Sequence, residues 1–111
     1  PKEEDVPLVF MSQIMPEFPG GIKGLQTYIA QNIKYPQEAI DEDIQGKVFV
    51  RFIINDKGIV ESESVIRSIH PLLDKEALRV VKSFPKWKPG TQNGRTVKVW
   101  YTVPIVFRIK N

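Results

Sequence analysis

Cysteine is absent from this chain of 111 residues, and histidine occurs only once, at His70. Without cysteine there can be no disulfide, no thiolate metal site and no cysteine nucleophile. A single histidine leaves little scope for a histidine-based metal cluster. We therefore expect no metal site and no cofactor.

Long hydrophobic runs are missing too, because no stretch of about 18 apolar residues, the length of a membrane span, occurs. The length and the 41% hydrophobic content fit one globular domain. The chain begins at Pro1, which predicts a fragment of a longer protein. We expect residues 1–14 to be the end of a linker, with a short strand in Leu8–Ile14, and residues 15–111 to form the domain.

Acidic residues are missing from the last third of the chain. All thirteen precede Lys82, whereas seven of the sixteen lysines and arginines lie from Lys82 onward. These cations either protect a strand edge against self-pairing or attract an acidic partner.

Catalytic motifs are also not found. His70 stands alone before a proline, which is typical of a capping or surface residue. Glu61 and Glu63 share one strand face, and Asp41–Asp43 lacks the spacing of a calcium loop. No glycine-rich phosphate loop occurs. We therefore predict that the chain is not an enzyme.

The strongest positive pattern is a strict alternation from Arg95 to Lys110. One face collects the apolar residues Val97, Val99, Tyr101, Val103, Ile105, Phe107 and Ile109. This period predicts a long, half-buried strand. Pro104 in its middle indicates a sheet edge, because proline cannot donate to a ladder on both sides. Such an edge either aggregates or receives a partner strand.

The elements before this strand follow from apolar spacing and from proline and glycine positions. We expect a helix from Ile22 that ends at Tyr35–Pro36, a second helical segment closed by Gly46, a central strand over Lys47–Ile54, a polar edge strand over Ile59–Ile69, and a helix from Pro71 that ends at Pro85.

Chain direction then restricts the topology. A tight turn at residues 55–58 makes the first two strands antiparallel. The next helix carries the chain back, so the last strand can be antiparallel only to the first. The sequence therefore predicts an α+β fold with a three-stranded antiparallel sheet of order 2-1-3 and helices on one face.

Several segments together resemble one family. They are MPEFPGG (Met15–Gly21), Asn32–Pro36, GKVFVRFIINDKGIV (Gly46–Val60), LDKEALRVVKSFPKWKPG (Leu73–Gly90) and VPIVF (Val103–Phe107). As an ordered set they resemble the C-terminal periplasmic domain of the energy transducer TonB, in the variant of Bacteroidetes-type proteins. The match covers nearly the whole chain from Met15.

The resemblance implies a TonB/TolA C-terminal-like fold and a periplasmic domain of a protein anchored in the inner membrane. Such a domain binds the TonB box and plug of outer-membrane transporters for siderophores, vitamins or glycans. The TonB box adds as a strand to the last strand, and this β-augmentation passes on work derived from the proton-motive force. The missing N-terminal part would associate with ExbB and ExbD.

Carried over by position, the resemblance also implies site residues. We expect partner contacts at Asn32, Ile33, Lys34 and Tyr35, with Tyr35 mainly packing, and along the last strand at Thr96, Val97, Lys98, Val99, Trp100, Tyr101 and Thr102. Structural roles are expected for Pro36, Gly46, Gly58, Trp87, Pro89, Gly90 and Pro104.

Other functional hypotheses stay open at this point. The same fold ends membrane-bound metallopeptidase sensors (BlaR1-like) and TolA-like envelope proteins, in which the edge would bind another protein. Trp87 and Trp100 among lysines could bind single-stranded nucleic acid, but the acidic first part argues against it and we expect no nucleic-acid partner. The same edge could also pair with itself in a homodimer.

Overall fold

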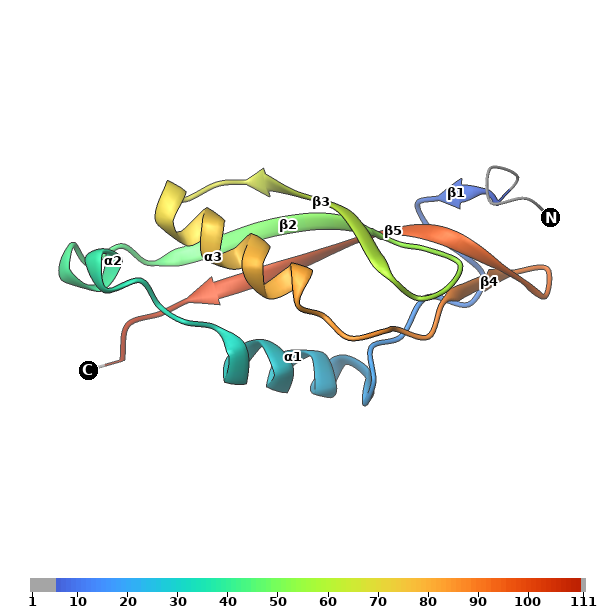
Figure 1. Cartoon of the computed structure of the whole chain (residues 1–111), viewed down its shortest axis with the longest axis horizontal. Coiled ribbons are helices and arrows are strands. Elements are labelled where there is room, and N and C mark those ends of the chain that lie inside the picture. Colours follow the sequence, from blue (N-terminus) through green and yellow to red (C-terminus); the bar gives the residue numbers. More distant parts are fainter. Residues whose placement is uncertain (1–5, 111) are drawn as a thin grey trace.

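The structure is a computed structural model, and it describes residues 6–110. Figure 1 shows the order of the elements along the chain. They are β1 (Leu8–Val9), α1 (Gly21–Asn32), α2 (Gln37–Asp41), β2 (Gly46–Ile54), β3 (Val60–Arg67), α3 (Pro71–Lys82), β4 (Gly90–Gln92) and β5 (Arg95–Phe107).

The sheet has the order β1-β5-β2-β3, with β4 paired to β5 outside this path. β2 lies antiparallel to β3 on one side and to β5 on the other, where Gly46 faces Phe107 and Ile54 faces Val99. β2 is therefore the central strand. The predicted order 2-1-3 corresponds to β3-β2-β5 and is confirmed, as is the α+β class.

Two short strands were not part of the predicted sheet. β4 forms a hairpin with the start of β5, in which Asn93 and Gly94, both with positive φ, make the turn. β1 pairs in parallel with Lys98 and Val99. The expectation that the last strand is an open edge over its whole length is therefore wrong at these two residues. A short strand was expected within Leu8–Ile14, where β1 lies, but two or three residues carry too little periodicity to predict which strand they pair with.

Some predicted boundaries also differ from the structure. The second helical segment ends at Asp41 rather than near Gly46, because Asp43 adopts a positive φ of 57° that breaks the helix. The last strand ends at Phe107, three residues before Lys110. His70 caps α3, as its place before a proline suggested, because its Nδ1 accepts a hydrogen bond from the Leu72 N–H at 3.1 Å.

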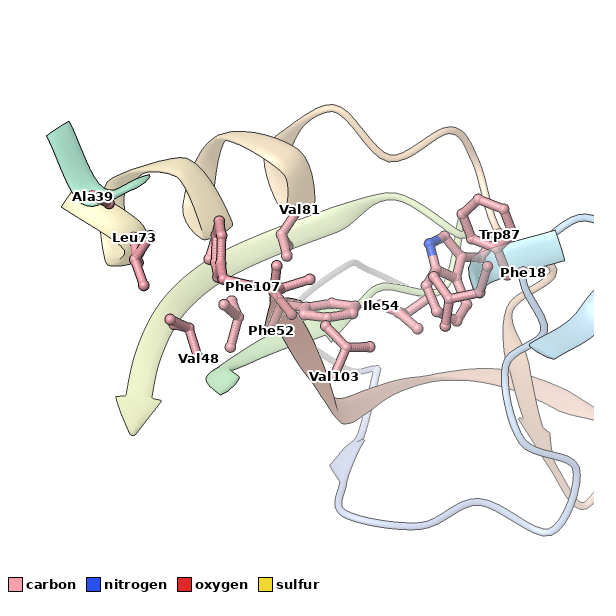
Figure 2. Close-up of a cluster of buried hydrophobic side chains, with 14 residues drawn as sticks. Phe18, Ala39, Val48, Phe52, Ile54, Leu73, Val81, Trp87, Val103 and Phe107 are labelled. Atoms are coloured by element: carbon pink, nitrogen blue, oxygen red, sulfur yellow. The ribbon is translucent and has the colours of Figure 1, made fainter. Parts of the chain in front are cut away.

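The helices cover one face of the sheet and close the core there. The inward residues of β2, β5 and α3 in this core include Val48, Phe52, Ile54, Leu73, Val81, Val103 and Phe107, as Figure 2 shows. α3 packs against β2 and β3, whereas α1 runs alongside β5 (Figure 1). The opposite face of the sheet carries no helix of the described part of the chain, which leaves it open on that side.

An aromatic cluster closes the other end of this core. Trp87 is only 2% exposed and lies beside Phe18 (Figure 2). Its ring meets the rings of Phe18, Phe52 and Tyr101 at centroid distances of 5.3, 5.8 and 5.0 Å. Its backbone N–H donates to the carbonyl of Gly58 at 2.8 Å. The segment before β4 is thereby fixed against the β2–β3 turn, which sets where β5 begins.

Candidate functional site

The outer edge of β5 is the side of that strand that faces away from β2. The Lys98 N–H donates to the Pro7 carbonyl at 2.9 Å across this edge. Backbone groups alternate along a strand, so the N–H groups of Thr102 and Val106 point the same way. Beyond Val99, β2 is the only strand in residues 6–110 that pairs with β5. The outer edge is therefore free over about its last two-thirds.

Pro104 lies in the middle of this free edge. It faces Phe49 of β2 in the register, and by the same alternation its nitrogen points outward. The strand tolerates proline here because the missing donor belongs to the edge and not to the β2–β5 ladder. The outer edge consequently offers donors at Thr102 and Val106 with a gap between them.

A groove of about 410 Å³ follows this edge between α1 and β5, and we call it the α1–β5 groove. From α1 and the residue after it, the groove is lined by Ile22, Leu25, Gln26, Ile29, Ala30 and Ile33. From β5 it is lined by Tyr101, Thr102, Val103, Pro104 and Val106. No charged side chain lines it, so the groove is suited to apolar side chains.

The structure brings some of the predicted contact residues together in this groove and separates others from it. Ile33, Tyr101 and Thr102 line the α1–β5 groove. Thr96 and Val97 lie near the β4–β5 hairpin, next to a different hollow. Lys98 and Val99 are covered by β1.

The side chains of Lys98 and Trp100 lie on the open face of the sheet and contact neighbours there. The Lys98 ammonium is 3.9 Å from Oε1 of Glu61. The guanidinium of Arg51 lies 4.7 Å from the centroid of the Trp100 ring, and the Phe10 ring stacks on it at 6.5 Å. The Arg51 Nε has no hydrogen-bond partner among the described residues. These contacts form a cationic and aromatic surface beside the free edge.

The segment from Asn32 to Lys34 is held by two residues of α3. The Lys34 N–H donates to Oε2 of Glu76 at 2.5 Å, and Arg79 donates to the Asn32 carbonyl at 2.7 Å. Arg79 also forms hydrogen bonds of 2.7 and 2.8 Å with Glu76. The Lys34 side chain is exposed, while the Asn32 amide donates to the Tyr28 carbonyl at 2.8 Å. These hydrogen bonds fix the position of Ile33 at the end of the groove.

The ionisation of Glu76 matches this role. Burial by itself raises the pKa of Glu76, but the hydrogen bonds from Arg79 and from the Lys34 N–H, with the charges of Arg79 and Lys34, outweigh it and lower the pKa. The hydrogen bond and charge of Glu76 raise the pKa of Arg79 in turn. Both groups are therefore charged at neutral pH and keep the Asn32–Lys34 segment in place.

Tyr35 packs inward rather than toward the groove. Its hydroxyl donates to the Ile44 carbonyl, and its ring meets the Phe107 ring edge-on at 5.5 Å. Burial, with a smaller contribution from the charge of Asp43, raises the pKa of Tyr35, so the hydroxyl stays protonated and can donate.

The residues for which structural roles were expected lie at element ends and turns. Pro36 caps α2, Gly46 begins β2, Gly58 lies in the β2–β3 turn, Trp87 is buried, Pro89 precedes β4, Gly90 begins β4, and Pro104 lies on the β5 edge.

The helix wall of the α1–β5 groove is not among the contact residues expected from the sequence. The predicted contact residues begin only at Asn32, yet Ile22 lines the groove and is 71% exposed. Ala30 is exposed as well. The apolar spacing of the helix does indicate such a wall. Its apolar stripe runs from Ile22 to Ile33, but only Leu25 is buried in α1, so the other apolar residues are free to line a groove.

Two further observations concern residues 6–110 as a whole. No group of three or more potential metal-ligating side chains gathers within them. None of their helices has the length and apolarity needed to cross a membrane.

Known proteins resemble this chain over most of its length. Residues 31–109 match the family described as the C-terminal part of the TonB protein of Gram-negative bacteria. No curated protein sequence matches.

Solved structures of TonB C-terminal domains are similar as well. A domain from Helicobacter pylori (residues 179–285) is 30% identical, with 78% of each chain covered and a TM-score of 0.62. A shorter form of it (residues 194–285) is 29% identical, covering 81% of this chain and 95% of that one, with a TM-score of 0.60. The domain from Pseudomonas aeruginosa shares the fold at 22% identity, covering 96% and 97%, with a TM-score of 0.60. The chain therefore belongs to the family of TonB C-terminal domains.

Proposed function

We propose that this domain binds the TonB box and plug of outer-membrane TonB-dependent transporters by adding a strand to the outer edge of β5. TonB C-terminal domains are periplasmic, non-catalytic protein-interaction domains, and the family implies transporters as partners. The observation that carries the proposal is the free part of the β5 edge, with outward N–H groups at Thr102 and Val106.

The proposed ladder lies further along β5 than the stretch from Thr96 to Thr102 that the sequence predicts. β1 already pairs with Lys98 and Val99, so a partner strand has room only beyond them. The contact stretch expected from the sequence and the proposed ladder share the residues Trp100–Thr102. The exposed side chain of Lys34, beyond the other end of the groove, contacts the plug in this proposal.

The energetics suit a coupling protein that must bind and release. Each added backbone hydrogen bond contributes about 1 kcal/mol net, and ordering the peptide offsets part of the total. The equilibrium affinity is therefore modest. A peptide pulled along its length nevertheless loads all bonds of the ladder together, so the complex transmits work derived from the proton-motive force, which reaches it from ExbB and ExbD through an inner-membrane anchor.

The experiment is a titration of the 15N-labelled domain with a peptide that carries a TonB box. We expect amide shifts at Trp100–Val103, at Ile105 and Val106, and at Ile33–Lys34. Thr102→Pro deletes one outward donor and leaves the β2 ladder intact, so it weakens binding, whereas Thr102→Val keeps the donor and serves as the matched control. Shifts confined to other surfaces, or equal binding by the two variants, would contradict strand addition.

A further inference from the structure

The two walls of the α1–β5 groove have the same length. The wall from Ile22 to Ile33 is about 17 Å long at the rise of an α-helix. The wall from Tyr101 to Val106 is also about 17 Å long at the rise of a β-strand. A strand of about five residues spans the same distance, so the groove matches a short extended segment rather than a helix or a compact ligand.

The groove lies over the strand edge and not on one face of the sheet. Tyr101 and Val103 belong to the helix-covered face of β5, whereas Thr102, Pro104 and Val106 are exposed on the opposite face. A hollow lined by both sets reaches around the outer edge. A strand paired to this edge therefore directs alternate side chains toward α1 and the others toward the open face.

The two sides differ in chemistry. Toward α1, an added strand meets a mostly apolar wall that includes Ile22, Ile29 and Ala30 and has one polar side chain, Gln26. Toward the open face, the charged residues paired with this stretch of β5 are cationic: Arg51 faces Thr102 and Lys47 faces Val106 in the register. These two cations favour a carboxylate on that side of an added strand.

We propose that the α1–β5 groove selects its partner by sequence, taking an extended segment of about five residues in which apolar side chains alternate with polar or acidic ones. The proposal rests on strand addition to β5 and goes beyond it by assigning the selectivity to side chains of α1. The backbone ladder alone is indifferent to sequence, whereas the apolar wall is not.

The first measurement compares two synthetic seven-residue peptides with capped ends and identical composition. One places three valines at alternate positions between glutamate and serine, and the other groups the valines together. Only the first presents all three valines to α1 in a paired strand. We expect the alternating peptide to bind at least about tenfold more tightly in a fluorescence or NMR titration.

The second measurement varies the helix wall without touching the core. Ala30→Glu places a charge in the groove, and glutamate is a good helix former at this exposed site. Gln31→Glu adds the same charge one residue along, outside the groove, and is the matched control. We expect Ala30→Glu to reduce affinity for the alternating peptide about tenfold and Gln31→Glu to leave it nearly unchanged.

The outcomes separate this inference from strand addition itself. Equal affinities of the two peptides, or equal effects of the two helix variants, overturn sequence selection even where Thr102→Pro still weakens binding. Loss of binding by both peptides, with Thr102→Pro without effect, overturns strand addition as well. Amide shifts at Ala30 and Thr102 that depend on protein concentration without peptide would identify a second copy as the occupant and also overturn the proposal.

Discussion

The backbone N–H of Lys34 donates to Oε2 of Glu76 at 2.5 Å, a contact between residues 42 positions apart in the chain. It joins the segment after α1 to the middle of α3. Arg79 strengthens this link by binding both Glu76 and the Asn32 carbonyl. The end of the α1–β5 groove at Ile33 is therefore positioned by a charged pair that contributes no atom to the groove.

Glu76→Gln is expected to destabilise the domain at neutral pH. It removes the charge that Arg79 and the Lys34 N–H stabilise, at a cost of about 1–3 kcal/mol in the free energy of unfolding. Because the folded-state pKa of Glu76 is lowered, this stabilisation is fully present above the ordinary glutamate pKa and is lost as the pH falls through the folded-state value. Urea denaturation of both proteins at pH 7 and at pH 3 measures it. A difference that does not shrink at the lower pH would show that the charge is not the cause.

Gly58→Ala is expected to be strongly destabilising. Gly58 has a φ of +83°, and a Cβ there would lie 1.9 Å from the Trp87 carbonyl oxygen. Strain and steric overlap together cost about 3 kcal/mol or more in the free energy of unfolding. Gly94→Ala is the control, because Gly94 also has a positive φ but a Cβ there would meet no atom within 4 Å, so it costs only about 1–2 kcal/mol. Similar losses in both variants, measured by thermal or urea unfolding, would show that the contact with Trp87 is unimportant.

Pro104→Ala is expected to strengthen strand addition. The substitution supplies an outward N–H in the middle of the free edge, between those of Thr102 and Val106. One extra hydrogen bond of about 1 kcal/mol corresponds to about fivefold higher affinity for a TonB-box peptide. Isothermal titration calorimetry measures the affinity, and sedimentation analysis follows any gain in self-association through the same edge. An affinity that stays the same or falls would place the partner elsewhere.

Deleting residues 1–9 is expected to expose the edge that β1 covers. The Lys98 amide then loses its acceptor, the Pro7 carbonyl, and exchanges faster with solvent. The amide of Val103, on the β2 side of the strand, should keep its protection. Hydrogen exchange followed by NMR compares the two amides directly. Unchanged protection of Lys98 in the shortened chain would show that β1 contributes nothing to this part of the edge.

Much of the fold could be predicted from local patterns. The alternation of β5 agrees with its burial, since Val97, Val99, Val103, Ile105 and Phe107 are all buried. The strand order of β2, β3 and β5 followed from chain direction and from the tight turn. A short strand was expected within Leu8–Ile14, where β1 lies, but its pairing with β5 could not be predicted, because that pairing joins segments far apart in the chain. β4 is only three residues long and has no pattern of its own.

The candidate site was only partly accessible to sequence reasoning. Pro104 indicated an edge, and the resemblance pointed to Asn32–Tyr35 and to β5. Which part of the edge is free depends on where β1 ends, and the helix wall of the groove depends on how far α1 stands from β5. Neither depends on local sequence, so Ile22, which is largely exposed in the groove wall, was not among the expected contact residues.

The sequence by itself determined the class of this protein, a single α+β domain without cysteine. It also determined a long edge strand, whose apolar face, proline and basic charge lie within residues 82–110. These features are local, because alternation, turn residues and charge act on neighbours along the chain. The tertiary structure alone decided that β1 covers Lys98 and Val99, that Glu76 and Arg79 hold the end of the groove, and that α1 faces the free edge. Those relationships join residues far apart in sequence, and packing of the whole domain is what brings them together.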